Sequence, residues 1–168
     1  MDVQDQASEG LNKVADLIKE IKFGMLTTLH ADDSLHSRPM TTLQMDSDGC
    51  LWFFASDRSW AADDIDEKSR VNIAYARVAK QDYLSVSGNA QIVRDRDKMQ
   101  ALWTPWIKPW FQDGLDDPDL ILLKVEIDAA DYWEAPGSMV KRLYGLAKGM
   151  LTGNTDALGE HGRVQGPH

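Results

Sequence analysis

The fold prediction starts from two neighbouring stretches, Ser37-Arg38-Pro39-Met40-Thr41 and Leu51-Trp52-Phe53-Phe54-Ala55-Ser56-Asp57-Arg58-Ser59. Both read as strands, and each is interrupted by a guanidinium, a proline or small hydroxyls. Proline cannot donate to a strand ladder, so the first strand is expected at a sheet edge or at a bulge. Apolar strand residues beside an arginine and hydroxyls suit a ligand with a flat apolar ring and an anionic tail.

Arg38 has two interpretations at this point. Its charge is costly to bury without a partner, so a structural Arg38 faces solvent or pairs with one of the 27 acidic residues. A functional Arg38 binds a phosphate, while Pro39 and Met40 lie along the ring. Ser56 and Ser59 also have two interpretations. Their hydroxyls can serve only to cap a helix, or they can belong to a helix N-terminus that binds an anion.

Strand signals dominate the middle of the chain, and helix signals dominate its ends. Helices are expected over 9–22 and 138–151, with two shorter ones beginning after Asp57 or Ser59 and after Asp95. Strands are expected at 24–29, 35–43, 51–55, 71–75, 83–94 and 120–127, the last continuing after a short break into 130–133.

Consecutive strands joined by short turns predict a β-dominated α+β protein, built on an antiparallel barrel with flanking helices. Gly88, in the middle of a strand, is expected to mark a bulge or bend of the kind that barrels need. We expect one domain over 1–151, with the barrel at 23–134, followed by a mobile tail over 152–168.

Composition and charge bear on partners and location. The 168 residues include 18 basic and 27 acidic ones, and the net charge of −9 disfavours nucleic acid and anionic membrane surfaces. The N-terminus lacks the pattern of a signal peptide, no run approaches the roughly 20 apolar residues of a membrane span, and Cys50 is alone. These features predict a soluble, cytoplasmic protein.

Motifs for catalysis are sparse. No His-x-x-x-His or Cys-x-x-Cys spacing occurs, so no metal site is expected, and no nucleophile elbow or glycine-rich phosphate loop is present. Any chemistry is therefore expected to come from a bound cofactor. Trp103, Trp106 and Trp110 crowd into one segment, where we expect core packing, dimer packing or a ligand face.

Several segments together resemble the general stress protein 26 branch of the flavin-binding split-barrel proteins, relatives of pyridoxamine 5′-phosphate oxidase. The resemblance runs from about residue 11 to residue 151, and no single segment is diagnostic. It rests on the number and order of the matching segments, which are 23–28, 36–40, 51–56, 83–88, 106–111, 116–120 and 130–134.

This resemblance implies a homodimer of split β-barrels with flavin mononucleotide, or a longer flavin dinucleotide, at the subunit interface. The implied cofactor-binding residues are Arg38, Pro39, Met40, Phe54, Ala55, Ser56, Ser59, Tyr83, Lys108, Trp110 and Trp133. Arg38 and Ser59 would reach the phosphate. Tyr83, Lys108 and Trp110 would come from the other subunit, and Trp133 would close the site.

Two departures limit what the resemblance implies. Many relatives carry a lysine two residues after the position of Ser59, where this chain has Ala61, so a charged phosphate contact is missing unless Arg58 replaces it. The oxidases proper have an Arg-Leu-His run near the C-terminus, where this chain has Arg142-Leu143-Tyr144. Pyridoxamine phosphate oxidation is therefore not expected.

Three functions remain open. The first is a flavin-dependent oxidoreductase among the general stress proteins, with no dedicated acid or base and no catalytic residue assigned. The second is a flavin-binding protein without turnover that buffers or senses the cofactor. The third is a dimeric interaction module whose tryptophan-rich segment binds another protein.

Overall fold

The computed structural model describes residues 1–4, 6, 8–135 and 160–167. In this part of the chain the helices are α1 (Glu9–Ile21), α2 (Trp60–Glu67) and α3 (Arg96–Leu102), with short 3-10 turns η1 (Pro105–Ile107) and η2 (Gly114–Asp116). None of these helices is both long and apolar enough to cross a membrane. The strands are β1 (Asp2–Val3), β2 (Phe23–Leu29), β3 (Leu35–Thr41), β4 (Gln44–Met45), β5 (Cys50–Ser56), β6 (Arg70–Arg77), β7 (Asp82–Val93), β8 (Leu120–Glu134) and β9 (Glu160–Gln165).

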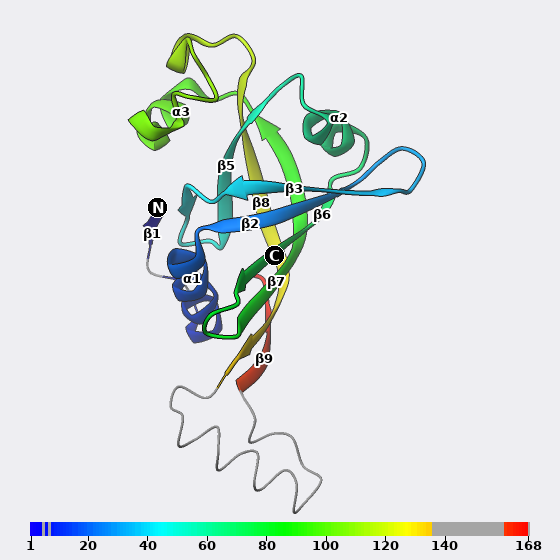
Figure 1. Cartoon of the computed structure of the whole chain (residues 1–168), viewed down its shortest axis with the longest axis vertical. Helices are drawn as coiled ribbons and strands as arrows, with labels where there is room; N and C mark the ends of the chain where they lie inside the picture. The colour runs from blue at the N-terminus through cyan, green and yellow to red at the C-terminus, as the bar shows by residue number, and fades with distance from the viewer. Residues whose placement is uncertain (5, 7, 136–159, 168) are drawn as a thin grey trace, which may run out of the picture.

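The strands form one curled sheet in the order β1-β4-β5-β8-β7-β6-β2-β3, and β9 pairs with β8 (Figure 1). All ladders among the described strands are antiparallel except the one between β1 and β4. Strand β3 is the last in this order, so the edge position predicted from Pro39 is confirmed. The predicted antiparallel split barrel with flanking helices is also confirmed.

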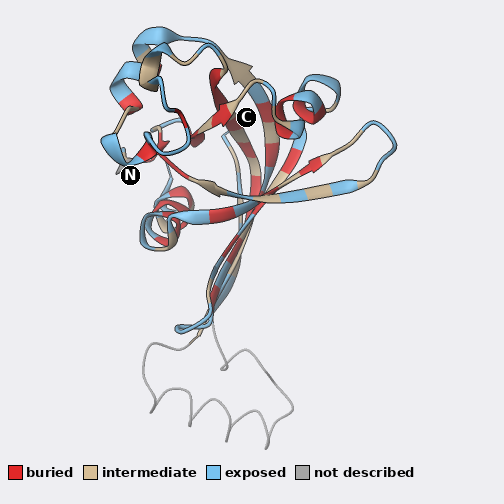
Figure 2. Ribbon diagram, turned by 45° about the horizontal axis from the view of Figure 1, so that its top comes forward, coloured by how far each residue is buried: buried red, intermediate tan, exposed pale blue. Residues whose placement is uncertain are grey.

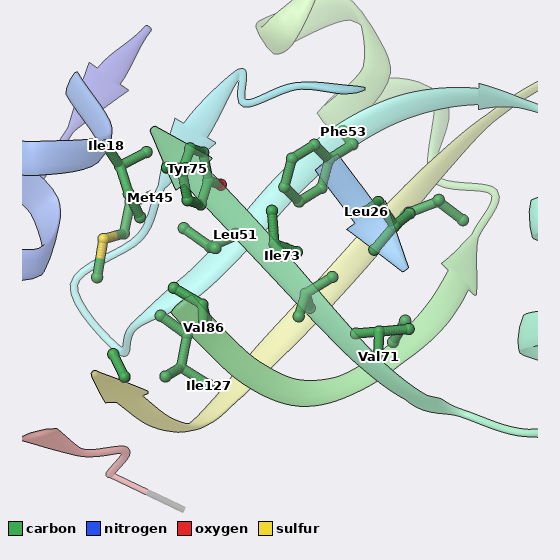
Figure 3. Close-up of a cluster of buried hydrophobic side chains, with 14 of the residues drawn as sticks. Ile18, Leu26, Met45, Leu51, Phe53, Val71, Ile73, Tyr75, Val86 and Ile127 are labelled. Carbon is green, nitrogen blue, oxygen red and sulfur yellow. The ribbon is translucent and has the colours of Figure 1, made fainter. Parts of the chain in front are cut away.

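Helix α1 forms where the apolar spacing predicted it. The Ser8 hydroxyl caps the helix by accepting a hydrogen bond from the backbone N–H of Leu11 at 3.2 Å. One face of the helix is buried, and Ile18 on this face lies near Met45 in the main core (Figure 3). Burial of this face, more than intrinsic propensity, stabilises the helix.

Apolar side chains fill the inside of the curled sheet. Leu26, Phe53, Ile73 and Ile127 come from four different strands and are 0% exposed (Figure 3). Tyr75 lies among them, and its hydroxyl shares a hydrogen bond with Thr42 at 2.7 Å. That bond satisfies the phenol in a fully apolar setting, where an unpaired hydroxyl would be costly.

A second apolar cluster fixes the segment that follows α3. Its buried members are Leu43, Trp52, Met99, Leu102, Ile107, Phe111, Leu120 and Leu122. Because Ile107 and Phe111 belong to this cluster, the segment 105–111 is anchored against the sheet. Figure 1 shows α3 and this segment together at one end of β5 and β8.

Gly88 marks a bulge, as its position within a strand predicted. The register between β7 and β8 shifts at this glycine, and Asp128 is the residue of β8 left out of the pairing. A Cβ on Gly88 would lie 2.1 Å from the carbonyl oxygen of Glu126, so only glycine allows the two strands to approach this closely. The expected break near residue 128 is this bulge, and β8 itself is continuous.

The tail expected from residue 152 onward is corrected by the structure, because β9 lies within it. β9 pairs with residues 129–134 of β8, on the edge that β5 leaves unpaired beyond Glu126. Unpaired backbone groups along a strand edge favour the addition of another strand. Val164 of β9 also packs against the main core. The predicted helix over 138–151 lies outside the described residues.

The β2–β3 hairpin is fastened to the end of α2. Lys68 donates hydrogen bonds from Nζ to the backbone oxygens of His30 and Ala31, each at 3.0 Å, and pairs with Asp33 at 2.7 Å. The hairpin turn is exposed, whereas α2 has buried positions along its length (Figure 2). These contacts bring β3 and α2 together, which positions the polar residues described below.

Candidate functional site

A pocket of about 490 Å³ opens beside the edge strand β3, and we call it the aromatic pocket. Its lining residues are Phe23, Pro39, Met40, Thr41, Leu43, Phe54, Ala55, Ser56, Trp106, Ile107, Trp110 and Phe111. Small-molecule sites typically have volumes of roughly 300–1,000 Å³ and mostly apolar linings with a few polar groups. The aromatic pocket therefore has the size and character of a site for a flat organic ligand.

Ring contacts hold the segment 105–111 over β5. The Phe54 ring packs against Trp103 and Phe111, with ring-centroid distances of 5.7 and 6.4 Å. Trp106 and Trp110 form an edge-to-face pair at 6.1 Å. These two tryptophans remain 47% and 69% exposed, so much of their ring surface is available to a ligand or a partner.

Six of the eleven predicted cofactor-binding residues meet in the aromatic pocket. They are Pro39, Met40, Phe54, Ala55, Ser56 and Trp110. Trp110 was expected to arrive from the other subunit, whereas here it lines a pocket of its own chain. The physical reason is its neighbour Phe111, which packs against Phe54 and holds the segment in place.

The start of α2 lies just beyond Ser56 in the chain, and serine hydroxyls accept hydrogen bonds from backbone N–H groups there. The Ser59 hydroxyl accepts a hydrogen bond from the N–H of Ala62, and the Ser56 hydroxyl accepts one from the N–H of Arg58, both at 3.3 Å. The first N–H groups of a helix have no partner within it and carry a partial positive charge. Arg58 itself is largely exposed and pairs with Asp119 at 3.0 Å.

Arg38 faces a buried carboxylate and is not among the residues lining the aromatic pocket. Its guanidinium donates to Thr28 Oγ1 at 2.8 Å and lies 3.3 Å from Asp64 Oδ2. Arg38 and Pro39 point to opposite faces of the strand, whereas Met40, on the same face as Arg38, still lines the pocket. Pairing with a carboxylate is one of the two interpretations that the sequence left open for Arg38.

Five side chains, Thr28, His30, His36, Arg38 and Asp64, form what we call the Asp64 cluster. The Asp64 carboxylate is 0% exposed, accepts from Thr28 at 2.5 Å, and lies 2.7 Å from His30 Nδ1 and 3.7 Å from His36 Nδ1. Burial would raise the pKa of Asp64, but hydrogen bonds from Thr28 and His30 and the charges of His30 and Arg38 hold it below its ordinary value. The hydrogen bond with Asp64 raises the pKa of His30.

Sequence reasoning missed the histidines and the carboxylate of this cluster. His30 begins the β2–β3 turn, His36 lies on β3, and Asp64 lies on α2, 34 residues after His30. No local motif spans such a distance. The one available signal was the pair of histidines flanking a predicted hairpin turn, which places them on neighbouring strands.

The remaining predicted residues lie elsewhere in the chain. Tyr83 and Trp133 occupy one register position across β7 and β8, at the opposite end of β8 from Leu120, which pairs with Ser56. The intervening strand is roughly 40 Å long at about 3.3 Å per residue. Both residues therefore stand apart from the aromatic pocket of their own chain. Lys108 is exposed within the segment 105–111 but does not line the pocket.

The curled antiparallel sheet defines a split-barrel protein, with an apolar pocket beside its edge strand. A family model described as pyridoxamine 5′-phosphate oxidase like matches residues 9–157. The chain therefore belongs to the pyridoxamine 5′-phosphate oxidase-like family.

Relatives and solved structures agree with this placement. Protein bli-3 of Neurospora crassa is 29% identical over 163 residues, which cover 91% of this chain and 78% of that protein. General stress protein 26 of Bacillus subtilis is 30% identical over 118 residues, covering 68% and 81%. The crystal structure of the general stress FMN/FAD binding protein from Xanthomonas citri superposes with a TM-score of 0.68 at 29% identity, covering 79% of this chain and 94% of that one.

Proposed function

We propose that the chain is a flavin-binding protein of the general stress type, with the flavin ring in the aromatic pocket. The observation that carries this proposal is the pocket itself, where six residues expected at a flavin site line one apolar space of about 490 Å³. The similar protein from Xanthomonas citri is described as binding FMN or FAD, which supports the same class of ligand here.

The residues of the pocket fit such a ligand. Phe54, Trp106 and Trp110 offer aromatic faces and edges to a flat ring. Thr41 and Ser56 offer hydroxyl groups among the apolar residues, where a few placed polar groups orient a ligand. We therefore expect the ring to lie against β3 and β5, under the segment 105–111.

The phosphate is expected at the start of α2, near Ser56 and Ser59, where helix N–H groups favour an anion. Arg38 is proposed as a further phosphate ligand. Because Asp64 already holds its guanidinium, Arg38 should contribute less than an unpaired arginine would. Ala61, on the first turn of α2, is 2% exposed and supplies no charge for a phosphate.

A bound flavin supplies hydride and electron transfer, and the chain's own residues would bind and orient it and exclude water from the ring. The twelve residues lining the pocket include no ionisable side chain. The pocket is suited either to redox turnover with an external electron donor or to binding without turnover, and FMN is the flavin we propose first, with FAD as the alternative.

We further propose a homodimer with the flavin at the subunit interface. Tyr83 and Trp133 can approach an aromatic pocket only from a second chain, because the length of β8 separates them from their own. Phe23 at the pocket is 62% exposed, and exposed apolar residues gathered with Trp106 and Trp110 are typical of an interaction surface. The buried, single Cys50 fits a reducing compartment, so we propose the cytoplasm.

Titration of the purified protein with FMN and FAD tests the proposal. We expect saturable binding of one flavin per chain, with a change in flavin absorbance and quenching of the fluorescence of Trp106 and Trp110. If equimolar FMN or FAD changes neither flavin absorbance nor flavin fluorescence, the proposal is wrong. Steady-state assays with NADH and NADPH then separate the two modes, because turnover of either nucleotide excludes purely passive binding.

A further inference from the structure

Outside the aromatic pocket, the Asp64 cluster brings together three side chains of the types that bind transition metals. One donor atom from each of His30, His36 and Asp64 lies within 4.8 Å of the other two. We propose that these three side chains bind one first-row divalent cation, with Zn²⁺ as the reference ion. Two imidazoles and one carboxylate are a common ligand set for such ions.

The separations of the donor atoms suit this proposal. Zinc–nitrogen and zinc–oxygen distances of about 2.0–2.2 Å put the donors of a tetrahedral site roughly 3.4 Å apart. His30 Nδ1 lies 2.7 Å from Asp64 Oδ1, and His36 Nδ1 lies 3.7 Å from Oδ2, the other oxygen of the same carboxylate. Small movements of two partly exposed histidines would complete the geometry.

His36 supplies an independent observation. Its Nδ1 is buried and has no hydrogen-bond partner among the described residues. A buried polar atom without a partner is costly, and a cation shared with Asp64 would satisfy it. The other ring nitrogen, Nε2, lies 3.3 Å from the Ser34 hydroxyl. Metal-binding histidines commonly have such an outer contact, because it fixes the orientation of the ring.

The charges around Asp64 are compatible with a bound cation, although Arg38 lies close by. Thr28 and Arg38 both contact Asp64 Oδ2, so Oδ1, beside His30, is the oxygen left for an ion. The Asp32 carboxylate interacts with the charges of both histidines and adds negative potential. His30 and His36 keep 45% and 36% of their side chains exposed, which gives the ion a route from solvent.

Metal titration of the full chain tests this site directly. Metal-free protein is titrated with Co²⁺, followed by its visible absorption bands, and with Zn²⁺ by calorimetry. We expect one ion per chain and displacement of Co²⁺ by Zn²⁺. His30→Gln and His36→Gln should each weaken binding by at least about tenfold, because even outer-shell partners of a metal are worth about 10–100-fold.

His161→Gln is the matched control, since His161 lies on β9 and contacts Trp133 at the far end of β8. This variant should bind the metal as the wild type does. Absence of saturable binding, retention of binding by folded His36→Gln, or an equal loss in His161→Gln would each overturn the proposal. Flavin titration of the same variants is the separate readout, because both histidines lie outside the aromatic pocket.

Discussion

The aromatic pocket and the Asp64 cluster both depend on β3, yet they differ in chemistry and in burial. Pro39 and Thr41 line a pocket whose twelve described lining residues carry no ionisable side chain, whereas His36 and Arg38 face a carboxylate that is 0% exposed. Neighbouring residues of one strand enter two environments because successive side chains point to opposite faces.

Stability and ligand binding depend on different residues in the two regions. In the Asp64 cluster the buried carboxylate has hydrogen-bonding and charged partners from the hairpin, so these contacts join β2 and β3 to α2. In the aromatic pocket, Trp110 is 69% exposed and packs edge-to-face on Trp106, itself 47% exposed. Substitutions in the cluster should therefore change folding stability, and substitutions in the pocket should change ligand affinity.

The largest expected effect comes from Asp64→Ala. This change leaves the Arg38 charge, Thr28 and His30 without their common partner, so we expect the free energy of unfolding to fall by about 3 kcal/mol. Urea denaturation measures the loss. Asp66→Ala, at an exposed position of the same helix, is the control and should change stability by no more than about 0.5 kcal/mol. Equal losses in the two variants would contradict a stabilising role for the cluster.

Trp110→Ala should weaken flavin binding and leave folding stability nearly unchanged. Because Trp110 is mostly exposed, stability should change little, while the loss of ring contact should weaken flavin binding by about tenfold. Fluorescence titration measures this affinity. Leu35→Ala removes a similarly exposed apolar side chain outside the pocket and should leave binding unchanged. Unaltered flavin affinity with loss of a protein partner would instead support the interaction module.

Arg38→Ala tests whether the two regions are coupled. If Arg38 reaches the phosphate, FMN and FAD should weaken by a similar factor of about three, and riboflavin, which lacks the phosphate, should be unaffected. The factor is small because Asp64 competes for the guanidinium. Calorimetry with the three ligands measures it, below the temperature at which the variant unfolds. Unchanged affinities for all three would assign Arg38 to the scaffold alone.

Local sequence signals predicted most of the fold correctly. The apolar spacing of α1, the position of Pro39 on an edge strand and the bulge at Gly88 each follow from a backbone or burial requirement that a short segment reveals. β9 was not predicted, because its pairing depends on the free edge of β8 and not on a strong pattern of its own.

The candidate site likewise has features that local sequence predicts and features that depend on long-range contacts. The sequence by itself determined that strands near Pro39 and Phe54 carry an apolar surface with hydroxyls at one end, since those properties belong to the residues. Only the tertiary structure decided that Arg38 meets Asp64, that His30 and His36 meet the same carboxylate, and that Trp110 covers the pocket of its own chain. Such contacts join segments far apart in the chain, and they are fixed by how the sheet curls and where α2 and the segment 105–111 pack against it.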